Sequence, residues 1–405
     1  MKFTALCLLT SIALFAQQRF PLEEIRAEGV AIPAPILQTL TGLKPGESVD
    51  EASFRKAAEK LQQTGLFSEI DFHYTPGPKK AGYSLIFALK EQPERMFSIF
   101  DFPGKPEAPI WACVQQQYPW LKNPLPSAGT AQDFLAHAAE RCTGIAPVVA
   151  KVESNMSTGR TQMVYQPRDL PHVTATPFVG PQRLTSKQVE EALALAAIDS
   201  EFTERRFMNL LEQNVRPYYD RFGMLSVKFI SISATPAPNG VVVTTKIDEG
   251  AVYKLKEVAI DGDGLPDEVL HGQHKFRIGQ TAEWLEILKS ISELEKPLKN
   301  IGYIFPRSTT SRSLDDAAST LALRVSVNRG PLVTFNTLAI IGASPDLEPK
   351  LRGMWKLAAG APMDMSAFDA YLQTIYRLPE LKAAKLSTGI RPLPGNKVDA
   401  LVTIR

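Results

Sequence analysis

The chain has 405 residues, of which 44% are hydrophobic and 22% are charged, which is the composition of a globular protein rather than a disordered one. Its 45 Lys and Arg residues nearly balance its 43 Asp and Glu residues, so the net charge is only +2. Because phosphate binding needs a concentrated basic surface, we expect no nucleic acid partner.

The N-terminus has the three-part layout of a secretory signal peptide. Lys2 precedes an apolar run over Phe3–Phe15, and Ala16 lies before the polar stretch 17–19. We expect residues 1–16 to be a signal peptide, with a retained membrane anchor as the alternative. The apolar run of about 13 residues is shorter than the roughly 20 that span a bilayer, and no later run comes close, so we expect no membrane span after cleavage.

A helical pattern gives way to a strand pattern at one glycine near the N-terminus. Asp50 can cap a helix whose apolar residues follow helical spacing, and Gly65 can end that helix because glycine adopts the left-handed conformation without steric cost. Beyond the glycine, Ile70, Phe72 and Tyr74 alternate with polar residues. This alternation predicts a strand with one buried face.

Three further segments complete a unit around this helix and strand. Segment 22–27 predicts a short strand, segment 35–40 a short helix, and segment 84–90 a second strand after a turn at 76–78. The order over 20–93 is therefore β-α-α-β-β, which can bury one face of a small sheet under two helices.

The same pattern returns along the chain at a fixed spacing. Gly223 lies 158 residues after Gly65, and Gly302 lies 79 residues after Gly223, where 158 is twice 79. The same step leads from Gly65 to Gly144 and from Gly302 to a position close to Pro379. A constant period of this kind predicts tandem structural repeats.

We therefore predict an α+β fold of five tandem β-α-α-β-β domains in an elongated array. The predicted boundaries are 20–93 for the first domain, 94–170 for a divergent second domain, 171–249 for the third, 250–330 for the fourth and 331–405 for the fifth. The linkers between these ranges are short, which leaves little freedom between neighbours.

Two cysteines remain after the signal peptide. In an oxidising compartment, Cys113 and Cys142 are expected to form a disulfide bond worth roughly 3–4 kcal/mol of stability. Two buried free thiols are the alternative. The repeat pattern puts one cysteine on each helix of the second unit, where the bond would join the two helices.

The repeat unit carries motifs that resemble POTRA (polypeptide-transport-associated) domains. One motif is a helix connector of the form xLxPGxxxD at 42–50, and another is a turn of the form GxFxxVxV at 65–72. The junctions at 248–262 and 328–342 are similar to the entry into such domains. The resemblance covers essentially all of the chain after the signal peptide and is weakest in the second unit.

POTRA arrays lie in the periplasm ahead of the β-barrel in outer-membrane assembly factors of the BamA and TamA type. The resemblance therefore implies export to the periplasm, with outer-membrane protein precursors or the barrel assembly machinery as partners. The sequence stops at Leu401–Arg405, inside the last predicted strand and without the strands of a barrel. We therefore expect that it does not insert barrels alone, and a separately encoded β-barrel is one candidate partner.

The resemblance also implies that the first arm of each hairpin is an open sheet edge, to which an extended segment can add by β-augmentation. The predicted edge strands are 69–74, 148–153, 226–232, 305–311 and 382–390. The candidate partner-binding residues on these edges are Ile70, Phe72, Tyr74, Val227, Phe229 and Leu386. Charged residues such as Glu69, Asp71 and Lys228 could instead block such edges.

No cluster of residues indicates catalysis, a metal or a cofactor. The pair His271 and His274 lacks further ligands for a metal, and Asp261–Gly264 lacks the later ligands of a calcium loop. We therefore expect a non-enzymatic binding and escort protein without cofactors. The alternatives are a structural scaffold that spans the periplasm between envelope complexes, and an enzyme built on an unfamiliar α+β fold.

Overall fold

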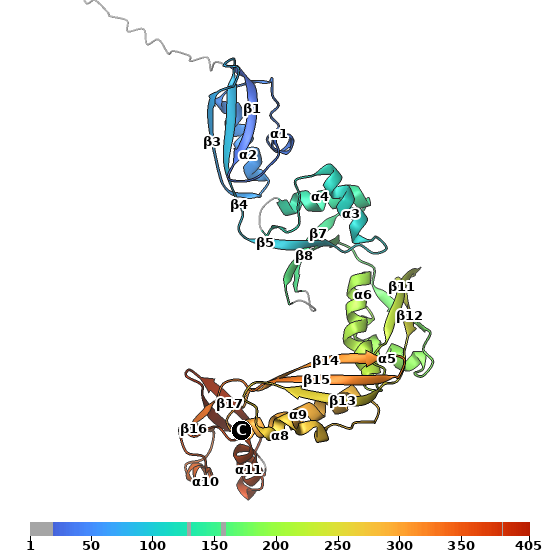
Figure 1. Cartoon of the computed structure of the whole chain (residues 1–405), viewed down its shortest axis with the longest axis vertical. Helices are drawn as coiled ribbons and strands as arrows, with labels where there is room; N and C mark the ends of the chain where they lie inside the picture. Colours follow the sequence, from blue (N-terminus) through green and yellow to red (C-terminus); the bar gives the residue numbers. More distant parts are fainter. Residues whose placement is uncertain (1–18, 128–130, 155–158, 383) are drawn as a thin grey trace, which may run out of the picture. The chain divides into compact units, whose positions relative to one another are not determined.

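The computed structural model describes residues 19–127, 131–154, 159–382 and 384–405, so the expected signal peptide at 1–16 lies outside the described residues. The described residues form five separate β-sheets, each with its own helices (Figure 1). The chain divides into two compact units. One runs up to Val173 and includes 199–207 and 238–241, and the other holds 174–198, 208–237 and 242–405.

The first sheet shows the topology that the other four follow. It consists of β1 (Phe20–Glu28), β2 (Ser48–Val49), β3 (Phe67–Pro76) and β4 (Tyr83–Glu91), with helices α1 (Ala34–Thr41) and α2 (Glu51–Gln63). The strand order is β2-β1-β4-β3, with β4 parallel to β1 and antiparallel to β3. Asp50 caps α2 as predicted, because its Oδ1 accepts the Ser53 N–H at 2.8 Å.

The second sheet is covered by two helices that a disulfide bond joins. Its elements are β5 (Arg95–Phe100), β6 (Leu125–Pro126), β7 (Val148–Ser154), β8 (Thr161–Pro167), α3 (Glu107–Gln117) and α4 (Ala131–Thr143), in the strand order β6-β5-β8-β7. Cys113 on α3 is bonded to Cys142 on α4, with their Cα atoms 5.9 Å apart. The bond therefore joins the two helices that cover this sheet.

The third sheet has an interrupted first strand. Its elements are β9 (Val173–Ala175), β10 (Phe178–Val179), β11 (Lys228–Ala237), β12 (Gly240–Asp248), α5 (Ser186–Ala197), α6 (Glu204–Leu210), a π-helix (Leu211–Val215) and α7 (Arg216–Asp220). Both β9 and β10 pair with β12, and β11 lies on the other side of β12.

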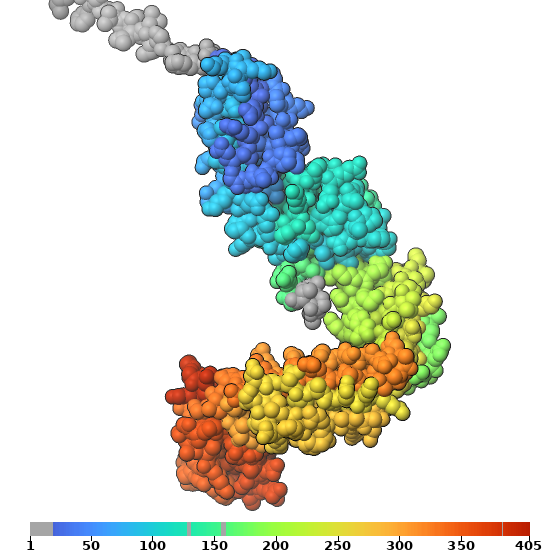
Figure 2. Space-filling view, viewed as in Figure 1, coloured from blue at the N-terminus to red at the C-terminus, as the bar shows by residue number. Residues whose placement is uncertain are grey.

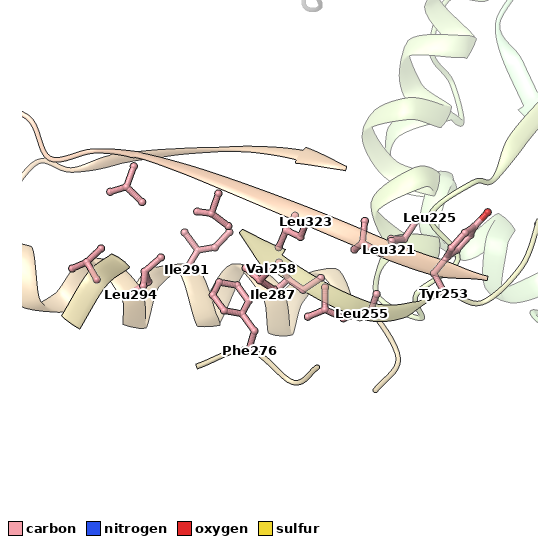
Figure 3. Packing of buried hydrophobic residues seen from close by; sticks show 14 of the residues in the cluster. Leu225, Tyr253, Leu255, Val258, Phe276, Ile287, Ile291, Leu294, Leu321 and Leu323 are labelled. Atoms are coloured by element: carbon pink, nitrogen blue, oxygen red, sulfur yellow. The ribbon is translucent and has the colours of Figure 1, made fainter. Parts of the chain in front are cut away.

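The fourth sheet is packed on one long helix. Its elements are β13 (Lys254–Asp261), α8 (Asp267–Leu270), a 3-10 helix (Gly272–Lys275), α9 (Trp284–Asn300), β14 (Arg307–Asp315) and β15 (Thr320–Asn328). Along α9, Ile287, Ile291, Leu294 and Leu298 recur at helical spacing and are buried. Figure 3 shows Ile287, Ile291 and Leu294 of this row packed under the strands together with Leu321 and other apolar residues of β13 and β15.

The fifth sheet repeats the same order. Its elements are β16 (Thr334–Ile341), α10 (Leu347–Gly353), α11 (Met365–Ile375), a 3-10 helix (Pro379–Leu381), β17 (Leu386–Leu393) and β18 (Lys397–Ile404), in the strand order β16-β18-β17. The strand predicted at 382–390 begins only at Leu386, because the turn that starts at Pro379–Leu381 continues through hydrogen bonds from Lys382 N–H to Pro379 O and from Ala384 N–H to Leu381 O. In this sheet, as in the others, the last strand in the sequence lies between the first strand and the hairpin arm.

The α+β prediction with tandem β-α-α-β-β units is thus confirmed, and each predicted range contains one whole sheet. The division into five independent domains stays a prediction. The glycines that define the period all have positive φ, with values of 67° at Gly65, 72° at Gly144, 73° at Gly223 and 99° at Gly302. Only glycine adopts this conformation readily, so the sequence period marks a repeated backbone turn.

In two places the turn glycine also binds the following repeat. Its carbonyl accepts the N–H of the residue just before the first strand of the following repeat. The carbonyl of that residue in turn accepts an N–H from the connector between the two helices of the following repeat. The bonds are Tyr253 N–H to Gly223 O (2.9 Å) with Ala282 N–H to Tyr253 O (2.8 Å), and Val333 N–H to Gly302 O (2.8 Å) with Met363 N–H to Val333 O (2.9 Å). Consecutive repeats are therefore joined here through backbone hydrogen bonds.

Glu249, which follows β12, holds the loop that leads into α5. Its Oε2 accepts the N–H groups of Gln182 (3.0 Å) and Arg183 (2.8 Å), and its Oε1 accepts the N–H of Leu184 (3.2 Å) and the Tyr219 hydroxyl (3.1 Å). Burial raises the pKa of Glu249, but the three N–H groups lower it more, so this pKa lies below its ordinary value of 4.5.

We expect this carboxylate to make the third repeat sensitive to acid. Since the pKa is lowered in the folded state, its stabilisation is complete above 4.5, the ordinary pKa, and is lost as the pH falls through the lower folded-state pKa. Hydrogen exchange of the amides at 182–184 should therefore rise more steeply below pH 4.5 in the wild-type protein than in Glu249→Gln. An equally steep rise in both proteins would contradict this assignment.

Candidate functional site

The first arm of every hairpin lies at a sheet edge. Among the described residues, β3, β7, β11, β14 and β17 each have a neighbouring strand on one side only. Their outer backbone N–H and C=O groups are therefore the places where a further strand could add. This arrangement is the one that the POTRA resemblance implies.

At the opposite edge of each sheet, the connector between the two helices pairs with residues at or near the beginning of the first strand. In the first two sheets, the short strands β2 and β6 pair with β1 and β5. In the other three, the connector makes a single bridge, namely His172 with Glu201, Lys254 with Thr281 and Thr334 with Pro362. The hairpin arms are therefore the longer unpaired edges.

The five edge strands differ in their charges. Four of them carry charged residues beyond the first position, namely Glu69 and Asp71 in β3, Lys151 and Glu153 in β7, Arg312 and Asp315 in β14, and Arg391 in β17. In β11 only the first residue, Lys228, is charged, and the stretch 229–235 has neither a charge nor a proline. Charge and proline are what keep natural edge strands from pairing, so β11 is the edge with the weakest protection.

β11 also has exposed apolar surface. Ile230 is 52% exposed and Ile232 is partly buried. Because successive side chains of a strand point to opposite faces, these two share one face, while Ser231 and Ser233 share the other. An added strand would therefore meet two isoleucines on one face, and Phe229 and two hydroxyl groups on the other.

Of the predicted residues Val227 and Phe229, only Phe229 lies within β11, where it is partly buried. Val227 lies one residue before β11 and is 1% exposed, and its carbonyl accepts a bond from Arg216 Nη1 at 2.9 Å. The Arg216 guanidinium carbon also lies 5.4 Å from the centroid of the Phe229 ring. Both residues thus contact Arg216 from the helical layer of their own repeat.

Sequence reasoning missed Ile230 and Ile232, although the repeat period contained the signal. The 158-residue spacing that relates Gly65 to Gly223 also relates Phe72 to Ile230 and Tyr74 to Ile232. When this spacing is applied to strand residues as well as to the turn glycines, it relates the aromatic residues of β3 to the two isoleucines of β11.

In the first sheet, Tyr74 is the most accessible of the three predicted residues. Ile70 and Phe72 are partly buried, and Tyr74 is 42% exposed. The Phe54 ring of α2 lies 6.2 Å from the Phe72 ring and 5.2 Å from the Tyr74 ring, measured between centroids. Phe72 and Tyr74 therefore lie on the face of β3 that α2 covers, and Glu69 and Asp71 point to the opposite face.

Leu386 lies at the start of β17 and is partly buried against the core of the fifth sheet. It pairs with Ile404 of the central strand β18. It contributes to packing as well as to the edge.

β14 reaches the surface in the orange band of Figure 2, and it is polar. The guanidinium carbon of Arg312 on β14 lies 3.4 Å from the centroid of the Trp284 ring, and its Nη1 and Nη2 donate to Asp220 Oδ2 at 3.2 and 3.3 Å. Burial raises the pKa of Asp220, and Arg312 opposes that effect. An ion pair with Asp220 of α7 therefore holds the side chain of Arg312 on this edge strand.

No group of three or more His, Cys, Asp or Glu residues that could hold a metal occurs within the described ranges. His271 and His274 each contact a backbone carbonyl through Nδ1, that of Asp267 at 3.0 Å and that of His271 at 3.2 Å. In the part of the chain that the structure covers, no helix has the length and apolar character needed to cross a membrane.

No protein-family model matches the chain. Among solved structures, BamA POTRA3-5 from Haemophilus influenzae is 20% identical with a TM-score of 0.41, over 65% of this chain and 100% of that one. POTRA1-3 of the periplasmic domain of Omp85 from Anabaena is 12% identical with a TM-score of 0.20, over 78% and 98% of the two chains. CdiB from Escherichia coli is 15% identical with a TM-score of 0.20, over 49% of this chain and 34% of that one. The BamA and Omp85 structures named here consist of POTRA domains, the domain type that the sequence motifs of this chain resemble.

Proposed function

We propose that this chain is a non-enzymatic binding protein of the periplasm that holds extended segments of outer-membrane protein precursors, or of a partner in barrel assembly, by β-augmentation. The observation that carries the proposal is the edge of β11, which has seven consecutive residues without charge or proline, at 229–235, among them the exposed Ile230. The periplasmic setting rests on the signal-like N-terminus and the POTRA motifs in the sequence.

The chemistry of β11 fits an amphipathic strand. In β-augmentation the main chain supplies affinity, while side chains on alternate positions supply selectivity. Ile230 and Ile232 would favour apolar residues on one face of the added strand, and Ser231 and Ser233 would accept polar residues on the other. Strands of outer-membrane barrels alternate apolar and polar residues in this way.

The other edges would contribute weaker contacts. Charges within β3, β7, β14 and β17 must be desolvated or displaced when a strand adds, which lowers affinity. Several weak edges on one chain still raise the effective concentration of a long unfolded segment. We therefore expect β11 to bind first and the other edges to add to retention.

The test uses a fluorescent synthetic peptide of alternating apolar and polar uncharged residues, with binding followed by fluorescence anisotropy. The wild-type protein should bind it with a micromolar dissociation constant. Ile230→Lys should weaken binding by at least about tenfold, because the new ammonium group must be desolvated when a strand pairs with β11.

Val152→Lys is the matched control, because Val152 is an apolar residue on the edge strand β7 and is 60% exposed. It should leave peptide binding unchanged. Equal loss in both variants, or in neither, would show that β11 is not the binding edge. If the wild-type protein does not bind the peptide but does bind a folded envelope partner, the result would favour the alternative function, a structural scaffold.

A further inference from the structure

Residues 199–207, between α5 and the middle of α6, form an ionic network with the second sheet. Arg205 donates through Nε to Asp101 Oδ2 at 2.9 Å and through Nη2 to Glu153 Oε2 at 2.7 Å. Arg206 donates through Nη2 to Glu153 Oε1 at 2.9 Å and through Nη1 to Glu201 Oε2 at 2.5 Å. Glu153 on β7 is therefore shared between two adjacent arginines.

Two neutral side chains extend the network. The Thr203 hydroxyl donates to Asp101 Oδ2 at 2.9 Å, and Gln166 Oε1 on β8 accepts a bond from Arg206 Nη2 at 2.8 Å. Asp101 and Gln166 are buried. Burial raises the pKa of Glu153, but Arg205 and Arg206 lower it more, so that it stays ionised at neutral pH.

This network lies on the face of the second sheet that is turned away from its helices. Tyr165 of β8 belongs to the core under α3 and α4, so the residues before and after it, Val164 and Gln166, point to the other face. In register, Lys151 is opposite Val164 and Glu153 is opposite Gln162. The arginines therefore contact this outer face.

The outer face of the second sheet is covered, unlike that of the fourth. Val164 and Gln166 are buried, whereas Arg324 at the centre of the outer face of β15 is exposed. A strand whose two faces are both buried needs a layer on each side, and Arg206 on segment 199–207 contacts the outer side of β8. Segment 199–207 thus acts as the second layer.

The backbone bond that joins other repeats is absent at this place. Phe202 N–H donates to the Pro171 carbonyl at 2.8 Å, just as Ala282 donates to Tyr253. Tyr253 in turn donates its own N–H to the preceding turn glycine, but Pro171 has no N–H to donate to Gly144. Side-chain charges therefore take the place of a backbone hydrogen bond.

We propose that Arg205 and Arg206 form an ionic latch that holds segment 199–207 over the outer face of the second sheet and releases it when ions compete for the carboxylates. The side chains of Arg205 and Arg206 remain 29% and 22% exposed, so dissolved ions reach them. The network balances three cations, Lys151, Arg205 and Arg206, with three anions, Asp101, Glu153 and Glu201. Because the charges balance, dissolved salt weakens the attraction between them and has no net repulsion to reduce. Release uncovers Val164 and frees the carboxylate of Glu153 on the edge strand β7.

The test introduces a thiol at the covered position, Val164→Cys, in the full chain with its disulfide intact. The rate of maleimide labelling should rise by about tenfold between low salt and about 1 M sodium chloride, where the screening length falls to about 3 Å. Adding Arg205→Gln and Arg206→Gln should give fast labelling already at low salt, with no further effect of salt. Arg324→Gln, which removes an outer-face arginine that is exposed, should change nothing.

A second thiol separates latch opening from unfolding of the sheet. Met163→Cys faces the helices on the same strand and should stay protected at every salt concentration. Salt-independent labelling at position 164, or equal rises at 163 and 164, would overturn the latch. The wild-type salt series decides the question even where the double arginine variant is unstable.

Discussion

Replacing Glu249 with alanine is expected to lower the free energy of unfolding of the third repeat by about 3 kcal/mol. Glu249 is 5% exposed, and its carboxylate accepts three backbone N–H groups and one tyrosine hydroxyl. Alanine leaves these donors in a buried position without an acceptor, and each unpaired donor costs more than the hydrogen bond itself contributes.

The measurement is urea-dependent hydrogen exchange of the third repeat, since a chain with several sheets need not unfold in one step. Glu191→Ala on α5 is the matched control, because its carboxylate is exposed and only 3.9 Å from Lys187 in a surface pair. Glu249→Gln should lie between the two, because its amide still accepts. A loss no larger than that of Glu191→Ala would mean that the loop at 182–184 has other support.

Removing the disulfide bond by Cys113→Ser with Cys142→Ser is expected to destabilise the second repeat by about 3–4 kcal/mol. The bond closes a chain segment with a sequence separation of 29, and it limits the freedom of the unfolded chain over that segment. It also joins α3 to α4, the two helices that form one side of the core of the second sheet.

Hydrogen exchange in the second repeat, with and without a thiol reductant, measures this effect. The reductant should destabilise the wild-type protein to the level of the double variant and leave the double variant unchanged. Exchange in the fourth sheet, which has no cysteine, should be the same in all samples. Equal stability of the oxidised protein and the double variant would show that the helix core alone holds this repeat.

Much of the fold could be predicted because the informative residues are local. Asp50 caps its helix through a residue three positions away, and Gly65, Gly144, Gly223 and Gly302 each occupy a turn that needs positive φ. These requirements can be recognised in the sequence of each repeat by itself. The period of 79 residues makes the turn glycine recognisable even in the divergent second repeat.

The site was harder to predict because it depends on which face of a strand is open. A shift of one residue turns every side chain to the other face, so the alternation in the sequence does not show whether the face of β11 with Phe229 or the face with Ile230 and Ile232 is the more exposed one. The early start predicted for the fifth hairpin has a different cause, since the turn that begins at Pro379–Leu381 continues through the N–H groups of Lys382 and Ala384 before the strand starts at Leu386. The contacts of Arg205 with Asp101 join residues about a hundred positions apart, and no local pattern indicates them.

The position of the last strand has a consequence for biogenesis. β4, β8, β12, β15 and β18 lie at the centre of their sheets although each is the final strand of its unit. A chain that is synthesised from its N-terminus therefore presents two helices and two unpaired strands before the strand that joins them is made. Each repeat stays unassembled until nearly all of it has been made, so synthesis and folding advance one whole repeat at a time.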